Sequence, residues 1–241
     1  MKILVIAAHP DDEILGMGGT IKKYTSGGHH VKIVIMSTGI SSRRSVDFKN
    51  STQYKVEKKL DKKMKQQIEK LRNHSKKAAR IVGVDDIEFF DFPDNEMDLV
   101  SNLEVTKKIE EVIRKFNPTI VYTHSTHDVN IDHRILYNAT ITATRPTVKS
   151  KVKEVYSFEI PSSSEWNFLE VFTPNTFVKI DKELKYKIKA MSKYVTELGT
   201  YPHPRSLEAL EIIAKRWGTV SGYHAAEAFT LVRQLKSDIN G

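Results

Sequence analysis

The 241-residue chain contains no cysteine. This absence excludes disulfide-stapled scaffolds, cysteine-ligated zinc fingers, iron–sulfur proteins and enzymes with a cysteine nucleophile. Any metal ion must therefore be held by His, Asp or Glu side chains. The chain also lacks a long hydrophobic run, since none approaches the roughly 20 apolar residues that a membrane-spanning helix needs.

The first residues do not predict export. Six apolar residues, 3–8, follow Met1 and Lys2, and a polar segment begins directly after them. This run is short for the apolar core of a signal peptide. The sequence therefore predicts a cytoplasmic protein with no membrane span.

One segment accounts for the net charge of +8. Residues 55–80 hold eleven Lys and Arg against three Asp and Glu, so the rest of the chain is neutral. A solvated helix face is the commoner explanation for such a segment. The functional alternative is a basic flap that draws an anionic sugar substrate toward the site. Nucleic acid is not expected as a partner, because aromatic side chains are not interleaved with the charges.

The first 150 residues alternate between predicted strands and predicted helices. Apolar runs without polar alternation predict strands buried on both faces, at 3–8, 31–36, 87–90 and 119–123. Apolar residues at helical spacing predict helices at 14–24, 68–82, 105–116 and 135–143. A long polar loop is expected over 38–65. This alternation predicts a Rossmann-like, three-layer α/β/α fold with a mostly parallel sheet.

The pattern changes after residue 150. Strands are expected at 152–160 and 176–180, and helices at 182–196 and 206–217. No linker separates this half from the first, so a single domain is predicted over 1–241. Residues 1–150 are expected to form the βαβ core with the site, and 151–241 to complete its pocket.

Metal-capable side chains follow two of the predicted strands. The first strand leads into His9-Pro10-Asp11-Asp12-Glu13, and the fourth into a segment, 124–133, with three His and two Asp. Ligands of open α/β sheets bind outside the carboxyl ends of the strands, where both clusters lie. An Asp at a helix start often caps that helix, but capping explains one Asp and not the whole run.

A metal site is the stronger interpretation of these clusters. His9 and Asp12 can converge on one ion, and His133 can complete a set of three ligands that leaves a position for water, as in catalytic zinc sites. Asp11 would then point into the same cavity without ligating. Taken singly, His124 and His127 are better explained as exposed loop residues.

At these residues the chain resembles the zinc-dependent N-deacetylases of the LmbE/PIG-L family, which remove acetyl groups from N-acetylglucosamine units in small conjugates and lipid-linked sugars. The likeness covers most of the chain. The first cluster and the later Asp132-His133 carry it. Weaker motifs follow in family order: Arg72 with Ala79 and Gly83, Phe92-Pro93-Asp94, and Ala226-Glu227-Ala228-Phe229.

The resemblance implies one zinc ion per chain on His9, Asp12 and His133, with Asp11 as general base. The predicted reaction is hydrolysis of an acetamide to acetate and an amino sugar, with Asp11 taking a proton from the zinc-activated water and returning it to the amine. It also implies that Arg72 and Asp94 face the sugar.

Two positions depart from the family pattern. Asn130 stands where many members have a His that steadies the oxyanion, and Ser75 stands where an acid often follows the Arg. Asn130, His127 or His224 could supply the oxyanion donor.

Other functions are less well supported. The glycines of Gly16-Met17-Gly18-Gly19 fall inside the predicted helix, whereas a dinucleotide-binding motif needs them in the preceding turn. Close packing of the helix on the sheet explains them better. A Gly-x-Ser-x-Gly elbow is absent, which argues against an α/β-hydrolase triad. The second hypothesis is a non-catalytic sugar- or nucleotide-binding module that keeps the fold. Related folds often assemble, so a homo-oligomer stays open.

Overall fold

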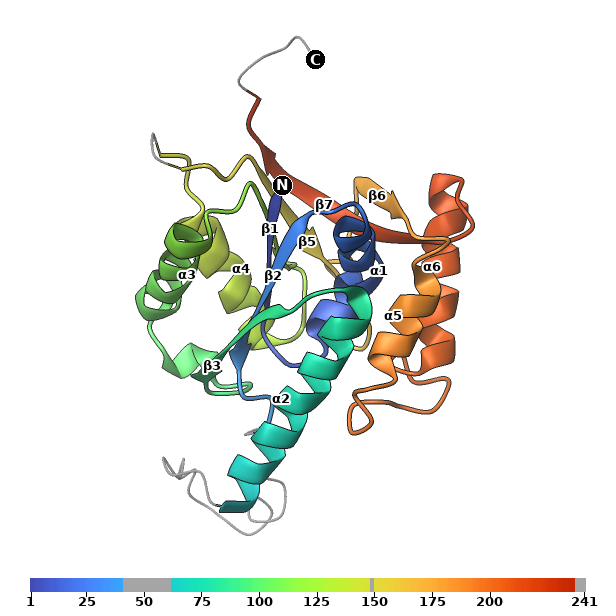
Figure 1. The fold of residues 1–241 in the computed structure, drawn as a ribbon, viewed down its shortest axis with the longest axis horizontal. Helices are drawn as coiled ribbons and strands as arrows, with labels where there is room; N and C mark the ends of the chain where they lie inside the picture. Colours follow the sequence, from blue (N-terminus) through green and yellow to red (C-terminus); the bar gives the residue numbers. More distant parts are fainter. Residues whose placement is uncertain (41–61, 148–149, 237–241) are drawn as a thin grey trace.

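The computed structural model describes residues 1–40, 62–147 and 150–236, arranged around a seven-stranded sheet in the order β3-β2-β1-β4-β5-β7-β6 (Figure 1). Five strands run parallel: β1 (Lys2–Ala7), β2 (His30–Ser37), β3 (Asp86–Phe92), β4 (Ile120–His124) and β5 (Glu154–Phe158). Strand β7 (Ala226–Gln234) pairs antiparallel with β5 on one side and with β6 (Thr176–Lys179) on the other. The predicted mostly parallel sheet is confirmed.

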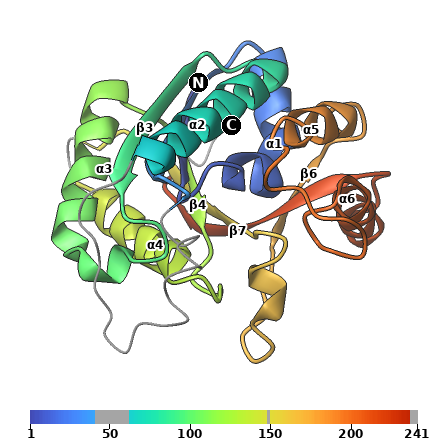
Figure 2. The same cartoon turned by 90° about the horizontal axis from the view of Figure 1, so that it is seen from below.

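Helices cover both faces of the sheet, which confirms the three-layer fold (Figures 1 and 2). One layer contains α1 (Asp12–Ser26), α2 (Lys62–Val82), α5 (Leu184–Met191) and α6 (Leu207–Ser221). The other contains α3 (Asn102–Phe116) and α4 (Ile131–Ala143). Strand β1 is buried between them: alternate residues, beginning with Ile3 and Leu4, join the two separate apolar cores. The strands of both halves of the chain form one sheet, so the chain is a single domain.

The order of the strands fixes where a ligand can bind. The chain places β2 and β3 on one side of β1, and then returns to add β4 on the other side. The carboxyl ends of β1 and β4 therefore lie side by side where the strand order reverses, the usual position of ligands in such sheets.

Several boundaries differ from those predicted. Helix α2 begins at Lys62, inside the predicted loop 38–65, whose residues 41–61 lie outside the described part of the chain. Helix α5 ends at Met191 and not near 196, because Tyr194 turns inward and is completely buried. Strand β7 was not predicted. Its sequence mixes polar and apolar residues, and pairing with both β5 and β6 holds it in the sheet. Short 3₁₀ helices, η2 (Met97–Leu99) and η3 (Ser164–Trp166), were also missed.

Helix α1 is bent, and a distant carboxylate holds the bend. Met17 has non-helical φ and ψ angles of −149° and 25°, which leaves N–H groups after it without helical acceptors. The carboxylate of Glu227 accepts hydrogen bonds from the N–H groups of Gly19 at 3.0 Å and Thr20 at 2.6 Å. Lys187 Nζ donates to the same carboxylate at 2.6 Å. The Ala-Glu-Ala-Phe motif thus fixes α1.

The glycines of α1 serve packing, as predicted. A Cβ atom at Gly16 would lie 2.5 Å from the ring of Phe158, and one at Gly19 would lie 2.8 Å from Ile180. Neither position has room for a side chain, so the helix lies close to the sheet.

The described part of the basic segment lies on α2, where Lys70, Lys76 and Lys77 are exposed. This exposure agrees with a solvated helix face. Within the described parts of the chain, every helix is too short or too polar to cross a bilayer.

Candidate active site

The turn between β1 and α1 brings polar side chains to the edge of the sheet. Pro10 favours extended backbone at His9. Asp11 then adopts φ 114° and ψ −26°, in the left-handed region that residues other than glycine rarely occupy. Such a conformation costs on the order of 1–3 kcal/mol and is commonest at functional sites. Asp11 holds the N-cap position of α1, yet its side chain makes no capping bond. Helix capping therefore does not explain this residue.

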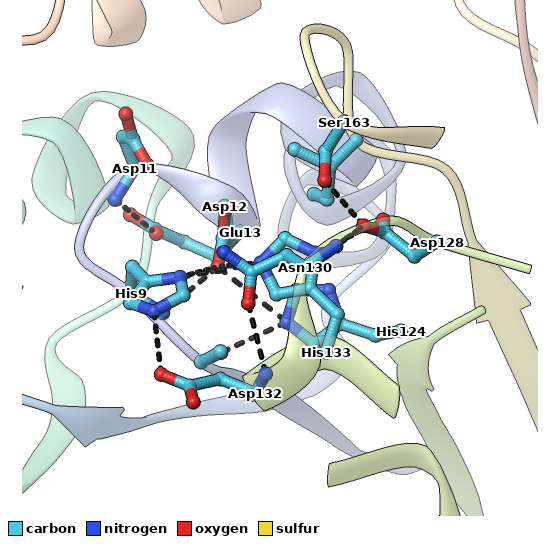
Figure 3. A network of polar contacts seen from close by, with 12 residues as sticks. His9, Asp11, Asp12, Glu13, His124, Asp128, Asn130, Asp132, His133 and Ser163 are labelled. Atoms are coloured by element: carbon cyan, nitrogen blue, oxygen red, sulfur yellow. Dashed lines mark hydrogen bonds and ion pairs between the residues drawn. The ribbon is translucent and has the colours of Figure 1, made fainter. Parts of the chain in front are cut away.

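Three side chains bring one donor atom each to a common point (Figure 3). His9 Nδ1 lies 3.2 Å from Asp12 Oδ2 and 3.2 Å from His133 Nε2, and the latter two atoms are 3.3 Å apart. All three residues are buried. Asp12 Oδ1 has no hydrogen-bond partner among the described residues. Two imidazoles and a carboxylate are a usual donor set for a catalytic metal ion, so these residues fit the predicted metal site.

Carboxylates behind the two imidazoles determine which ring nitrogens face each other. His9 Nε2 lies 3.1 Å from Asp94 Oδ1 and 3.0 Å from Asp132 Oδ2. His133 Nδ1 lies 2.9 Å from Asp128 Oδ2. Because carboxylates only accept, a proton on each outer nitrogen is favoured when the rings are neutral. The inner nitrogens therefore present lone pairs, the arrangement that carboxylate–histidine pairs impose at metal centres.

The same contacts shift pKa values within the cluster. Burial alone would lower the pKa of His9, but hydrogen bonds to carboxylates, Asp12 foremost, raise it well above its usual value. Burial alone would raise the pKa of Asp12, but His133 and His9 hold it well below its usual range. His9 therefore favours its protonated form and Asp12 its ionised form. Protons and a metal cation compete for the same atoms.

Asp128 is itself fixed by residues of the second half of the chain. The hydroxyl of Ser163 donates to its Oδ1 (Figure 3). The hydroxyl of Ser164 donates to Oδ2 at 2.9 Å. Burial would raise the pKa of Asp128, but His133 and Ser163 lower it to about 2. An ionised Asp128 therefore orients His133.

The side chain of Asn130 caps the N-terminus of α4. Its Oδ1 accepts the N–H of Asp132 at 2.9 Å, and its Nδ2 donates to Asn95 Oδ1 at 2.7 Å. The Asp132 carboxylate accepts the N–H groups of Asn95 at 2.6 Å and Met97 at 3.0 Å. Asn130 thus braces the residues behind His9, and its role toward an oxyanion stays a prediction.

His124 is completely buried, so its interpretation as an exposed loop residue is wrong. Its Nε2 accepts the N–H of Ala8 at 2.8 Å, and its ring stacks on His133 with centroids 4.0 Å apart. Burial, and then the nearby His133, lower the pKa of His124 well below its usual value. A neutral His124 therefore packs against His133, one of the three residues of the predicted metal site. His127, in contrast, is exposed, as predicted.

Asp11 contacts an arginine that the sequence did not reveal. Its Oδ2 lies 3.0 Å from Arg205 Nη1, while its Oδ1 is buried without a hydrogen-bond partner in the described part of the chain. Burial raises the pKa of Asp11 well above its usual value, and Arg205 opposes that shift. A gap of 194 residues separates the pair, so no local spacing could have suggested it.

Glu13 lies beside Asp11 and was also not singled out from the sequence. Its Oε2 accepts the N–H of Asp11 at 3.1 Å, and the hydroxyl of Tyr194 donates to its Oε1. Burial raises the pKa of Glu13 to about 7. Glu13 holds the strained backbone of the turn.

The structure does not gather all the predicted substrate residues. Asp94 is buried against His9. Arg72 donates to Asp91 at 2.6 Å and to the carbonyl of Phe90 at 3.2 Å. His127 Nδ1 lies 3.3 Å from Glu170 on the surface. His224 is exposed just before β7. In the portion that the structure describes, Arg72, His127 and His224 make no contact with the predicted metal ligands.

Comparisons of the sequence with known proteins identify a family and a curated relative. The family model described as PIG-L, GlcNAc-PI de-N-acetylase, matches residues 4–144. The diacetylchitobiose deacetylase of Thermococcus kodakarensis is 28% identical over 238 residues, covering 96% of this chain and 83% of that protein.

Solved structures share the fold. The N,N'-diacetylchitobiose deacetylase of Pyrococcus horikoshii superposes with a TM-score of 0.73 at 23% identity, covering 99% of this chain and 86% of that one. GalB, the 4-carboxy-2-hydroxymuconate hydratase of Pseudomonas putida KT2440, also gives 0.73, at 20% identity over 100% and 99% of the chains. At such identities the likeness shows the fold alone. The family match spans more than half of the sequence, and the chain belongs to the PIG-L family.

Proposed function

We propose that the protein hydrolyses the N-acetyl group of an amino sugar or sugar conjugate, releasing acetate and a free amine. One observation carries the proposal: Asp11 lies in the same turn as His9 and Asp12, which form a cluster with His133, and one oxygen of its buried carboxylate has no partner among the described residues. A metal-held water and a neighbouring base are the two parts that amide hydrolysis needs. Family membership and the deacetylase relatives support the same reaction.

His9, Asp12 and His133 would hold one zinc ion per chain. When bound, the ion lowers the pKa of its water and polarises the acetyl carbonyl. The two outer carboxylates on His9 and the one on His133 contact the outer nitrogens, so that the inner nitrogens face the ion and can serve as its ligands when it displaces their protons.

Asp11 moves the proton. Its Oδ1 accepts a proton from the attacking water while the water oxygen bonds to the acetyl carbon. The same carboxyl group then gives the proton to the nitrogen as the carbon–nitrogen bond breaks, so the amine leaves neutral. Burial, which raises the pKa of Asp11, makes the protonated form accessible within the cycle, and this supports a base that also acts as an acid.

The predicted substrate contacts differ in how well the structure supports them. Asp94 has the best support because it lies beside His9. Arg72, His127 and His224 stay predicted contacts of the sugar, and Asn130 a predicted oxyanion donor. An anionic substrate, a cytoplasmic location, a homo-oligomer and a pocket completed by residues 151–241 also stay predictions.

Acetate release from a panel of N-acetylated sugars tests the proposal. The panel contains free, nucleotide-linked and thiol-conjugated sugars and diacetylchitobiose, each with and without a chelator. We expect acetate from at least one substrate, loss of turnover with chelator, and recovery with added zinc. No acetate from any substrate, together with no bound metal, would overturn the proposal. Sugar binding without acetate release would favour the non-catalytic module instead.

A further inference from the structure

Arg205 reaches the candidate active site from the connection between α5 and α6. Its backbone is fixed there: its N–H donates to His203 Nδ1 at 3.1 Å, and its carbonyl accepts the N–H of Gly199 at 3.4 Å. The next residue, Ser206, caps α6 by accepting the N–H of Ala209 at 3.0 Å. The arginine is therefore held at the start of a helix and not on a freely moving loop.

The guanidinium group of Arg205 is anchored at two points. Its Nε donates to Ser162 Oγ at 2.7 Å, and its Nη1 donates to Asp11 Oδ2 at 3.0 Å. The side chain is only 24% exposed. Because the guanidinium is planar and rigid, two contacts fix its orientation. Ser162 thus aims Arg205, and Arg205 in turn meets Asp11.

The consequence for Asp11 is that its two oxygens are not equivalent. Oδ2 is occupied by Arg205, whereas Oδ1 makes no hydrogen bond to any described residue. The backbone of Asp11 is in the left-handed region, and its N–H is tied to Glu13. With the backbone fixed and one oxygen held, the rotation of the carboxylate group is restrained.

We propose that Arg205 is a positioning residue for the general base, holding Oδ2 of Asp11 so that Oδ1 alone faces the reacting water. The inference rests on the proposed function, in which Asp11 moves the proton. It also gives residues of the second half of the chain a part in the chemistry, since Arg205 and Ser162 both belong to that half.

Two other roles for Arg205 make different predictions. A purely structural link would matter for folding but not for turnover of the folded protein. A substrate contact would show in KM. A positioning role lowers kcat of the folded protein while KM and metal content change little.

The test compares kcat, KM, zinc content and Tm for Arg205→Met, Arg205→Lys and Ser162→Ala. Arg216→Met serves as the matched control, since Arg216 is exposed on α6 and packs on the ring of Trp217. We expect Arg205→Met to lower kcat about 100-fold, the lower end of the range for general acid–base catalysis, with KM within about threefold. Arg205→Lys should retain more activity, Ser162→Ala should lose less than about tenfold, and the control should match wild type.

Rescue separates positioning from folding. Millimolar guanidinium chloride should restore part of the turnover of Arg205→Met, but none to Asp11→Asn, which lacks the base. Wild-type kcat in Arg205→Met, a change confined to KM, or a loss of zinc that explains the loss of turnover would each overturn the inference. If Arg205→Met fails to fold, Arg205→Gln, which also removes the charge, takes its place, and wild-type kcat in that variant overturns the inference equally. Absence of turnover in the wild type would instead contradict the proposed function, and the inference falls with it.

Discussion

Two buried charged clusters adjoin helix α1, and their polar atoms are satisfied to different degrees. Halfway along the helix, Glu227 accepts three hydrogen bonds, from the N–H groups of Gly19 and Thr20 and from Lys187. Lys187 also donates to the carbonyl of Leu15 at 2.8 Å. At the start of the helix, Asp11 and Asp12 each keep one buried oxygen without a partner in the described residues.

The difference separates structure from function. Buried polar groups in native proteins are nearly always paired, so an unpaired one requires an explanation. In the cluster around Glu227, both carboxylate oxygens have partners. The cluster around Asp12 is incomplete, and it adjoins a strained residue, Asp11. A bound ion and a water molecule would complete it. Substitutions in the two clusters should therefore change different properties.

The largest expected effect is that of Asp11→Asn on turnover. The amide cannot accept the water proton, so kcat should fall roughly 10²–10⁴-fold. Tm should stay the same or rise, because the substitution removes a carboxylate whose ionised form burial disfavours. Acetate release and thermal unfolding on the same preparation measure both. Near-full turnover with zinc bound would show that Asp11 is not the base.

Glu227→Ala should have the opposite profile. It leaves Lys187 buried without its partner, which should lower the free energy of unfolding by about 3–5 kcal/mol. The turnover of the folded fraction should change only a few-fold. Denaturant unfolding and initial rates check this, with Glu227→Gln as the milder control because it keeps an acceptor. A loss of turnover as large as that of Asp11→Asn would mean that the two clusters are not separate.

Asp128→Asn should weaken metal binding without removing a ligand. The change should lower zinc affinity about 10–100-fold, as is usual when a carboxylate behind a metal-ligating histidine is lost. Competition with a chromogenic chelator measures the affinity. Lys107→Ala, on the exposed face of α3, is the control and should bind zinc like wild type. An unchanged affinity in Asp128→Asn would show that this carboxylate does not orient His133.

The smallest expected effect concerns Glu159, which is not part of the predicted metal site. Burial raises its pKa to about 7, although Trp217 Nε1 donates to it. The pKa of this carboxyl group is therefore higher in the folded state than in the unfolded state, where it is about 4.5. The contribution to stability is fully present below pH 4.5 and is lost as the pH rises through 7. Glu159→Gln should therefore be about 1–3 kcal/mol more stable than wild type at pH 8, with little difference at pH 4.5. Urea unfolding at both pH values checks the sign, and equal pH dependence would contradict it.

Much of the fold could be predicted from local pattern. Apolar runs identified β1, β2, β3 and β4 because strands buried on both faces have no polar alternation. Strand β7 could not be found this way, since its pairing with strands distant in sequence decides its conformation. The end of α5 was missed for a related reason: the burial of Tyr194 against Glu13 outweighs local helical spacing.

The candidate site divides in the same way. His9, Asp12 and His133 could be predicted because the carboxyl ends of β1 and β4 meet where the strand order reverses. Arg205 could not, because it reaches Asp11 through tertiary structure alone. Asp128 lay within the predicted cluster, and its spacing before His133 was a signal that could have identified it as an orienting carboxylate.

A zinc titration of the chelated protein tests the central claim most directly. Acetate release is measured on the substrate that the panel identifies, while zinc is added back in sub-stoichiometric steps. Turnover should rise linearly and reach its plateau at one equivalent per chain, and His133→Ala should show no such rise. Turnover that is independent of zinc, or a His133→Ala variant that responds like wild type, would contradict the assignment of this cluster as the catalytic metal centre.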